Sequence, residues 1–272
     1  NYEISNTYNA IQSNLSFYLS NEFSLSDKFK SILGLRAENY NLYYTGQNQQ
    51  GDIVYEDENL LSELDLFPSI NLIYGLKEMS NLRFSLSRTI ARPSFKEKSI
   101  AQIFDPVTST TFIGNIDILP TKILNYDLRW ELFQENAQMY AISLFYKDFT
   151  NPIELVVYNG ASPNDFTPKN VDEAKVYGIE LEFRKNLEFI SESLSNFKLT
   201  FNTSIIRSEE IMDEKEYEGR IKSARSGEVV SRKRELQGQS PFLVNLGLNY
   251  NSINNNFEGS LNYNVQGKTL QI

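Results

Sequence analysis

The residues best suited to chemistry are carboxylates that recur at short spacing beside basic side chains. Asp127 and Glu131 stand on either side of Arg129, and Glu180 and Glu182 precede a further arginine. Paired carboxylates can act as general acid and base when their surroundings push their pKa values apart. These pairs lie on strand-like runs among basic neighbours, which favours ion pairs instead. We therefore predict no enzymatic activity.

Two residue types that catalysis often needs are missing. The 272 residues contain no Cys and no His, which excludes disulfides, thiolate sites, cysteine nucleophiles and His-dependent triads, together with the commonest zinc ligand. The chain has 35 acidic and 26 basic residues, a net charge of −9. Nucleic-acid binding requires a basic patch, so this balance opposes it. We predict no metal centre and no cofactor.

One further chemical candidate is an acidic segment. Its six carboxylates are Glu209, Glu210, Asp213, Glu214, Glu216 and Glu218. They could gather a cation, but they lack the spacing of a calcium-binding loop. Five basic residues follow them: Lys222, Arg225, Arg232, Lys233 and Arg234. We interpret the segment as a solvated loop whose charges compensate one another.

The elements that must position these residues have the period of β-strands. In NLRFSLSR, which begins at Asn81, apolar and polar residues alternate strictly, which is typical of a strand with one apolar face. Since no stretch keeps a helical period over three turns, we expect almost no helix. The predicted strands are Asn9–Leu19, Lys28–Tyr44, Phe67–Leu76, Asn81–Ile90, Lys122–Phe133, Gln138–Phe149, Lys175–Leu187, Asn196–Ile206, Phe242–Tyr250 and Phe257–Gly267.

Short and long connections alternate between these ten strands. The short ones are Ser20–Asp27, Lys77–Ser80, Gln134–Ala137, Glu188–Ser195 and Asn251–Asn256. The long ones are Thr45–Leu66, Ala91–Thr121, Thr150–Ala174 and Arg207–Pro241. An up-and-down antiparallel wall with tight turns at one rim and elaborated loops at the other has this pattern. Outer-membrane barrels show that asymmetry.

The hydropathy agrees with such a barrel. The chain has no apolar run near the roughly 20 residues of a spanning helix, but a barrel strand crosses with about 9–11 residues, of which only alternate ones face lipid. A mean hydropathy of −0.40 is therefore compatible with a membrane location. We predict an all-β, transmembrane, antiparallel up-and-down β-barrel of a Gram-negative outer membrane.

Aromatic residues recur on the apolar phase near the short-turn end of each strand. An interfacial girdle requires such a row, whereas ordinary packing of a soluble core is the alternative. The girdle candidates are Phe84, Trp130, Tyr140, Phe183, Phe197, Tyr250 and Phe257, with Phe17, Phe29 and Tyr74 completing the row.

The opposite phase carries charges that cannot share a dry core unless they are paired. These predicted lumen-facing residues are Arg36, Glu38, Arg83, Asp127, Arg129, Glu131, Glu180, Glu182, Arg184 and Lys198.

Several motifs resemble a known family in sequence order. SNLRFSLSRTIARPSFKE (Ser80–Glu97) resembles the barrel signature of TonB-dependent outer-membrane receptors, and GNIDILP (Gly114–Pro120) resembles the turn that follows it. Ala141–Pro152, Val176–Arg184 and Leu236–Tyr250 resemble later strands of that barrel. Arg88 and Arg92 fall in the lipid-facing phase near the loop rim, where we expect them to brace the long loop rather than to contact lipid phosphate.

The resemblance implies a 22-stranded barrel plugged by an N-terminal domain. Residues 1–272 would be part of that one barrel domain, from its middle to late strands, without the plug, the first strands or the last strands. It implies uptake of a scarce extracellular nutrient with energy transmitted by TonB. The implied partners are outer-membrane lipid, the TonB complex, the plug and a possible surface lipoprotein.

The long loops would then form part of a binding vestibule. Their aromatics could stack on a siderophore, glycan, vitamin or peptide, although such rings also fold loops onto themselves. The candidates are Tyr55, Phe95, Phe104, Phe112, Tyr158 and Phe166. Three other classes stay open: a passive porin or adhesin, an outer-membrane hydrolase barrel, which the absence of His disfavours, and a soluble extracellular protein that binds carbohydrate. The sequence does not identify the ligand or the oligomeric state.

Overall fold

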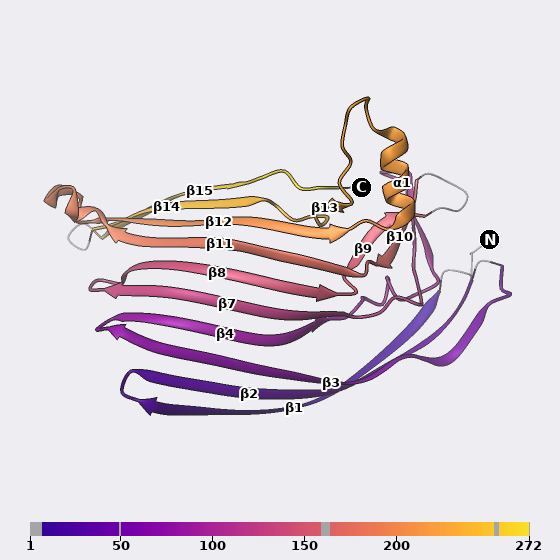
Figure 1. Cartoon of the computed structure of the whole chain (residues 1–272), viewed down its shortest axis with the longest axis horizontal. Coiled ribbons are helices and arrows are strands. Elements are labelled where there is room, and N and C mark those ends of the chain that lie inside the picture. The colour runs from indigo at the N-terminus through magenta and orange to yellow at the C-terminus, as the bar shows by residue number, and fades with distance from the viewer. Residues whose placement is uncertain (1–6, 49, 159–163, 253–255, 272) are drawn as a thin grey trace.

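A single antiparallel wall dominates the fold (Figure 1). The computed structural model describes residues 7–48, 50–158, 164–252 and 256–271. Ten strands pair in the order β1-β2-β3-β4-β7-β8-β11-β12-β14-β15, which confirms the predicted number and order. Their bounds are β1 Tyr8–Ser26, β2 Phe29–Gln47, β3 Val54–Lys77, β4 Ser80–Ala91, β7 Thr121–Gln134, β8 Gln138–Thr150, β11 Glu173–Asn186, β12 Phe197–Ile211, β14 Phe242–Ser252 and β15 Phe257–Gln266. Within the described residues β1 and β15 are the two edges, so this part of the barrel is not closed.

The two ends of the wall differ as predicted. Tight turns lie at the left in Figure 1, while the longer loops, the only α-helix among the described residues and a second sheet lie at the right. At the turn end Met79, Asn136 and Ala137 adopt positive φ, which allows the chain to reverse within a few residues. Two 3₁₀ turns, η2 (Leu187–Phe189) and η3 (Glu192–Leu194), join β11 to β12. Of the predicted connection Asn251–Asn256, residues 253–255 lie outside the described residues, and Asn251 and Ser252 belong to β14.

The predicted loop Thr45–Leu66 is wrong in extent. β2 continues to Gln47 and β3 begins at Val54, so the connection shrinks to a tight hairpin in which the Asn48 side chain accepts hydrogen bonds from the backbone N–H groups of Asp52 and Ile53, both at 3.1 Å. The run from Glu56 to Asn59 is polar on both faces. This part of the hairpin extends past the apolar face of the wall, so its residues need not alternate between apolar and polar. The sequence therefore shows no period-2 signal of a strand there.

Two of the long loops fold together into a second sheet, which was not predicted. The loop after β4 contains β5 (Gln102–Asp105) and β6 (Thr110–Ile113), and the loop after β8 contains β9 (Ile153–Val157) and β10 (Asp165–Asn170). Their order is β5-β6-β10-β9, with β6 and β10 parallel. We call these four strands the loop sheet.

The loop after β12 holds a short helix, the only α-helix among the described residues, which confirms the prediction of almost no helix. Helix α1 (Glu214–Ser223) begins at Asp213, whose side chain accepts a hydrogen bond from the N–H of Glu216 at 2.8 Å. Acidic residues in its first turn and basic residues in its last complement the helix dipole. A two-residue strand, β13 (Lys233–Arg234), then pairs with the end of β12. Among the described residues, no helix has the length and apolar character needed to cross a bilayer.

The two faces of the wall are inverted relative to a water-soluble protein. Leu128 is 40% exposed on one face, whereas Glu131 on the other is 4% exposed. Glu38 and Asp65 are similarly buried on that polar face, while the only buried apolar cluster among the described residues is centred on Tyr40 and Leu42. Exposed leucines beside buried carboxylates are costly in water but suit a wall with lipid outside and a polar interior. We call the two sides the apolar face and the polar face.

One large apolar residue, Phe145, lies on the polar face, and packing explains its position. Phe145 lies directly opposite Gly178 in the register of β8 and β11. A Cβ at Gly178 would meet the Phe145 ring at 2.8 Å and would collide with the carbonyl oxygen of Ile205 on β12. The ring therefore lies over the glycine, in the manner of aromatic rescue of a strand glycine.

We expect Gly178→Ala to destabilise the wall by about 1–3 kcal/mol, because the new methyl group must displace backbone or ring. The matched control is Gly259→Ala, where the nearest atom would be the Phe257 ring at an ordinary 3.6 Å. Thermal denaturation of the full-length protein in detergent measures the difference. Equal midpoints for the two variants would contradict the packing account.

Candidate functional site

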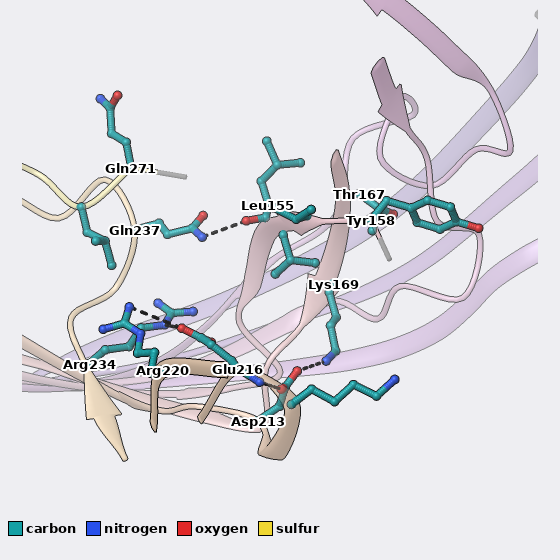
Figure 2. Close-up of a pocket in the computed structure, with 14 residues that line it drawn as sticks. Leu155, Tyr158, Thr167, Lys169, Asp213, Glu216, Arg220, Arg234, Gln237 and Gln271 are labelled. Carbon is teal, nitrogen blue, oxygen red and sulfur yellow. Dashed lines mark hydrogen bonds and ion pairs between the residues drawn. The ribbon is translucent and has the colours of Figure 1, made fainter. Parts of the chain in front are cut away.

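A pocket of about 590 Å³ opens at the loop end of the wall (Figure 2). The loop sheet forms one side of it, and α1 with the segment after β13 forms the other. Its lining residues are Leu155, Val156, Val157, Tyr158, Thr167, Lys169, Asp213, Lys215, Glu216, Arg220, Arg234, Gln237, Leu270 and Gln271. The pocket thus depends on contacts between three segments that are distant in sequence.

The loop sheet supplies the apolar part of the pocket. β9 and β10 pair in antiparallel register, and beyond the end of β9 the N–H of Tyr158 donates to the carbonyl of Asp165 at 2.7 Å. This bond fixes the backbone from which the exposed Tyr158 ring projects (Figure 2). Leu155 lies between this ring and the amide group of Gln237, whose Nε2 donates to the Leu155 carbonyl at 2.8 Å.

An ion pair ties α1 to the loop sheet. Lys169 of β10 donates to the carboxylate of Asp213 at 2.5 Å, and the same carboxylate caps α1. The hydrogen bond from Lys169 is the main cause of a lowered pKa of Asp213, and the bond from the Glu216 N–H adds to it. Asp213 therefore stays ionised, and it fixes the start of the helix against β10.

Arg234 is the centre of the site. Its guanidinium donates to Glu154 of β9 at 2.6 Å and to Glu216 of α1 at 2.8 Å, and it also contacts Glu210 of β12. The side chain of Arg234 is only 6% exposed. A planar guanidinium with five N–H donors can bridge several carboxylates in this way. One residue therefore joins the wall, the loop sheet and the helix.

The two acids beside Arg234 have opposite protonation behaviour. Both acids lie outside the membrane-spanning part of the wall. Glu154 is in the loop sheet, and Glu210 is the next-to-last residue of β12, past the 9–11 residues that a strand needs to cross a membrane. Burial, the largest single influence, disfavours the charge on Glu154, but the hydrogen bonds from Arg234, Glu210 and the Gln237 N–H, with the charge of Arg234, together outweigh it and lower the pKa of Glu154. Burial, then the neighbouring Glu154, raise the pKa of Glu210 to about 9. Glu210 therefore holds a proton at neutral pH.

A second cavity, of about 680 Å³, lies on the polar side of this cluster. It shares Leu155 and Gln237 with the outer pocket, and Glu154 and Arg92 also line it. Glu154 accepts a hydrogen bond from the Gln237 N–H at 3.0 Å. The contact between β9 and the segment after β13 therefore separates the outer pocket from the interior of the wall.

The predicted loop aromatics divide into two groups. Phe104, Phe112 and Phe166 lie on β5, β6 and β10, and register places Phe112 beside Phe166. Tyr158 follows β9 and is the only one of the six that lines the outer pocket. Phe95 lies exposed in the loop after β4.

The placement of Tyr55 in a loop is wrong. It lies in β3, where its ring meets the ring of Tyr44 edge-on at 6.0 Å. Because the Tyr44 ring is buried, Tyr55 forms part of a packed hairpin rather than of the pocket.

The charged residues of the polar face form two networks. In the first, Glu38 pairs with Arg36 at 2.6 Å and with Arg92 at 2.7 Å, and Arg92 also reaches Asp65 at 3.1 Å. The expectation that Arg92 faces lipid is therefore wrong. β4 ends at Ala91, so alternation stops there and Arg92 turns to the polar face, where it braces the loop.

The second network crosses four strands. Glu131 pairs with Arg83 at 2.5 Å and with Arg129 at 3.2 Å, and Arg129 continues to Glu182 at 3.0 Å. Arg184 reaches Glu182 at 3.9 Å. Asp127 and Lys198 share this face without an ion pair in the described part of the chain, and Glu180 there accepts a hydrogen bond from Ser204 at 3.4 Å.

The aromatic residues predicted as a girdle lie on the apolar face towards the turn end. Tyr140 contacts Phe183 with ring centroids 5.3 Å apart, and Tyr250 contacts Phe197 at 4.8 Å and Phe257 at 5.9 Å. The Trp130 indole donates to the Ser80 hydroxyl at 3.2 Å, and Phe84 lies further along β4. Their role at a lipid interface remains a prediction.

The acidic segment is only partly the solvated loop that we expected. Glu209 and Glu210 belong to β12, and Glu210 is fully buried. Glu214 and Glu218 do form exposed pairs, with Arg232 and Lys222. Across the described ranges, no group of acidic residues is arranged to hold a metal ion. One signal in the sequence could have indicated the buried cluster, since Glu154 is the only charged residue in the apolar run IELVV.

The geometry of the outer pocket suits the binding of a small molecule. An aromatic ring and aliphatic side chains lie opposite amide groups and cations, an arrangement that small-molecule sites share. The carboxylates at the site are held by Arg234 and Lys169, so they anchor loops together and are not free to exchange protons with a ligand.

The sequence matches one family model and a set of solved structures. The model, described as TonB dependent receptor-like, beta-barrel, matches residues 1–271. Sequence comparison with curated proteins finds no match.

Three of the similar solved structures are outer-membrane proteins or transporters. The copper transporter OprC is 14% identical with a TM-score of 0.67, covering 94% of this chain and 34% of OprC. The unliganded ferric citrate transporter FecA is 15% identical with a TM-score of 0.65, covering 95% and 33%. The alcaligin outer-membrane receptor FauA from Bordetella pertussis is 15% identical with a TM-score of 0.57, covering 96% and 38%. At these identities the likeness shows a shared fold, and the chain spans about a third of each protein's length.

Proposed function

Because the chain belongs to the family of TonB-dependent receptor-like β-barrels, we propose that it forms part of the wall and outer vestibule of a receptor that imports a scarce extracellular nutrient. Barrels of this family are integral to the outer membrane, which removes the soluble extracellular alternative. Residues 1–272 would belong to one barrel domain. The energy would come from the TonB complex, acting on a plug inside the closed barrel.

The observation that carries this proposal is the pair of cavities at the loop end. The outer pocket and the inner cavity share Leu155 and Gln237, and the inner one reaches Arg92 on the polar face. A ligand held outside could therefore pass to the interior once the contact between β9 and the segment after β13 opens. The geometry favours a receptor over a simple pore, because the outer pocket is lined by specific polar groups.

The nutrient would be a small molecule with an apolar or aromatic part and several hydrogen-bonding groups. Tyr158 offers a ring face, Gln237 and Gln271 offer amides, and Lys169 and Arg220 bring positive charge to the rim. A ferric siderophore, a glycan, a vitamin or a peptide each meets part of this description. A surface lipoprotein that closes over the loops would be an additional partner.

We expect Tyr158→Ala to weaken binding of the true ligand about tenfold, since an aromatic contact contributes about 0.5–1.5 kcal/mol beyond its buried area. The full-length protein would be titrated with ferric chelates, cobalamin, oligosaccharides and peptides. Phe104→Ala is the matched control, because this exposed ring lies on the loop sheet but does not line the pocket.

The transport part of the proposal has a separate measurement. In cells that lack TonB, the ligand should bind with unchanged affinity while its uptake stops. Uptake that continues without TonB would identify a passive channel. Equal ligand affinities of Tyr158→Ala and Phe104→Ala would show that the outer pocket does not bind the ligand. That result would not contradict the transport proposal.

A further inference from the structure

One edge of the loop sheet lies along the outer pocket. β9 pairs with β10 on one side, and within the described residues no strand pairs with its other edge. Four consecutive residues, Leu155 to Tyr158, line the pocket. Successive side chains of a strand point to opposite faces, so a pocket over one face would contact only every second residue. The pocket therefore follows the outer edge of β9, where backbone groups can reach a ligand (Figure 2).

The pairing of β9 with β10 shows which backbone groups point to this edge. In an antiparallel ladder, residues that bond to the partner strand alternate with residues whose N–H and C=O groups point away from it. The N–H of Tyr158 donates to the Asp165 carbonyl across this ladder. Counting back from Tyr158, every second residue bonds to β10. Leu155 and Val157 therefore direct their N–H and C=O groups outward, towards the pocket.

A side-chain contact agrees with this assignment. The amide Nε2 of Gln237 donates to the outward carbonyl of Leu155 at 2.8 Å, in the position that the N–H of an added strand would take (Figure 2). Pro168 is the register partner of Leu155, at a position where the ladder requires no N–H from β10. Within the described residues, the outward N–H groups of Leu155 and Val157 and the carbonyl of Val157 have no hydrogen-bond partner.

The pocket also carries an unpaired positive charge. Its charged lining residues are Lys169, Lys215, Arg220, Arg234, Asp213 and Glu216. Each of the two carboxylates is held by at least one cation, at 3.5 Å or less. Arg234 is balanced further by the buried acids Glu154 and Glu210. Lys215 forms no ion pair in the part of the chain that the structure describes, so the pocket complements a ligand with an acidic group.

We propose that the outer pocket binds an acidic oligopeptide as an added strand along the outer edge of β9, and that such peptides are the imported nutrient. This inference rests on the proposed function and names its substrate class. An extended peptide repeats N–H and C=O groups at the spacing of the strand edge, whereas a glycan or a metal chelate does not. Four residues of a strand span roughly 13 Å, which sets the length of the bound segment. Tyr158 would pack on a peptide side chain, and Lys215 would pair with the acidic group.

The first test measures peptide retention by the full-length protein in detergent. The probe is a synthetic library of random hexapeptides, and mass spectrometry identifies the peptides that stay bound. A second library carries a methyl group on every backbone nitrogen, so it keeps the side chains but loses the backbone donors. We expect about a hundredfold weaker retention of the methylated library, since each of two lost hydrogen bonds contributes up to about tenfold. Equal retention of the two libraries would overturn the proposal.

A pair of substitutions tests the same edge from the side of the protein. Val157→Pro removes the outward N–H and no bond to β10, so it should weaken binding of the retained peptides about tenfold. Val157→Ala keeps that N–H and loses only the side chain, and it should bind nearly as wild type does. Equal affinities of the two variants would contradict strand addition. Hydrogen-exchange protection of the Tyr158 amide reports that the loop sheet of Val157→Pro is folded. If this protection is lost, the comparison of the two libraries decides the question.

The acidic preference has its own matched pair. K215Q should abolish the enrichment of Asp and Glu among the retained peptides, whereas K222Q, on the same helix but outside the pocket, should preserve it. Enrichment that persists in K215Q would contradict the proposed pairing.

The failure of this proposal can be distinguished from the failure of the proposed transport. Binding of a ferric chelate, a glycan or cobalamin that depends on Tyr158, without retention of any peptide, would overturn the peptide assignment and leave the receptor role intact. Conversely, uptake of the retained peptides by cells that lack TonB would contradict active transport and leave strand addition intact.

Discussion

Replacing Arg234 with methionine is expected to release α1 and β13 from the loop sheet while the wall stays folded. Methionine keeps much of the volume and removes the charge. Glu154 and Glu210, 4% and 0% exposed in their side chains, would then lose their common cation. Breaking one partner of such a buried cluster costs about 3–5 kcal/mol, because an uncompensated charge remains.

Hydrogen exchange of the full-length protein locates this loss. Amides of α1 and of β9 should exchange more than a hundredfold faster, which is what about 3 kcal/mol of local opening predicts. Amides at the centre of β8, which lie in the wall away from the cluster, should be unchanged. A uniform change across both regions would mean that Arg234 acts on global folding and not on the closure of the pocket.

The same cluster gives the loop end a pH dependence whose sign follows from the two acids. The pKa of Glu210, raised to about 9 from 4.5, means that its contribution is full below pH 4.5 and is lost as the pH rises towards 9. The pKa of Glu154 is lowered, so its contribution is present above pH 4.5 and is lost as the pH falls through its folded value. The closed loop end should therefore be most stable near pH 4.5, where both contributions are close to full, and should weaken as the pH rises from there towards 9.

Substitution with glutamine separates the two acids within this experiment. Glu210→Gln keeps the shape of the protonated side chain. In the wild type, loss of one proton from Glu210 should raise the opening equilibrium of α1 by up to about tenfold per pH unit on the alkaline side. In the variant this alkaline loss of amide protection should disappear. Glu154→Gln removes the charge that Arg234 requires and should weaken protection at neutral pH. If the two variants behaved alike, the assignment of the proton to Glu210 would be wrong.

The sequence predicts the wall well, because the physical constraint on it is simple. Every crossing strand must place apolar residues on one side and polar residues on the other, and ten strands obey that period-2 rule. The turn end was also predictable, since tight turns leave few alternatives. The same alternation assigns the turn-end aromatic residues to the apolar face and the charged residues to the polar face.

The loop end was not predictable for equally physical reasons. β5 and β6 have four residues each, too few to show a period, and β6 pairs with β10, which lies over fifty residues away in sequence. Helix α1 has no buried residues, so it has no apolar stripe to detect. Arg234 looked like one of several solvated cations, and only its three-dimensional neighbours distinguish it.

Arg92→Met is expected to detach the loop after β4 from the long hairpin of β2 and β3. Arg92 is the first residue after β4, and its side chain is 15% exposed and lies over the ring of Tyr40, 4.3 Å from the ring centroid. Its removal leaves Glu38 and Asp65 without their shared cation. We expect a loss of about 3–5 kcal/mol in the closure of this loop, measured as faster exchange of the Lys98 amide, which bonds to the Ser94 carbonyl.

Arg36→Gln is the matched control, because Arg36 pairs with the same Glu38 carboxylate from a side chain that is 49% exposed. Solvent screens this pair, so its loss should cost about 1 kcal/mol or less. The variant E38Q/D65N/R92M, which removes all three charges, should recover most of the closure lost in R92M. Recovery would show that the penalty comes from stranded carboxylates, whereas a triple variant as open as R92M would show that Arg92 holds the loop by its packing on Tyr40.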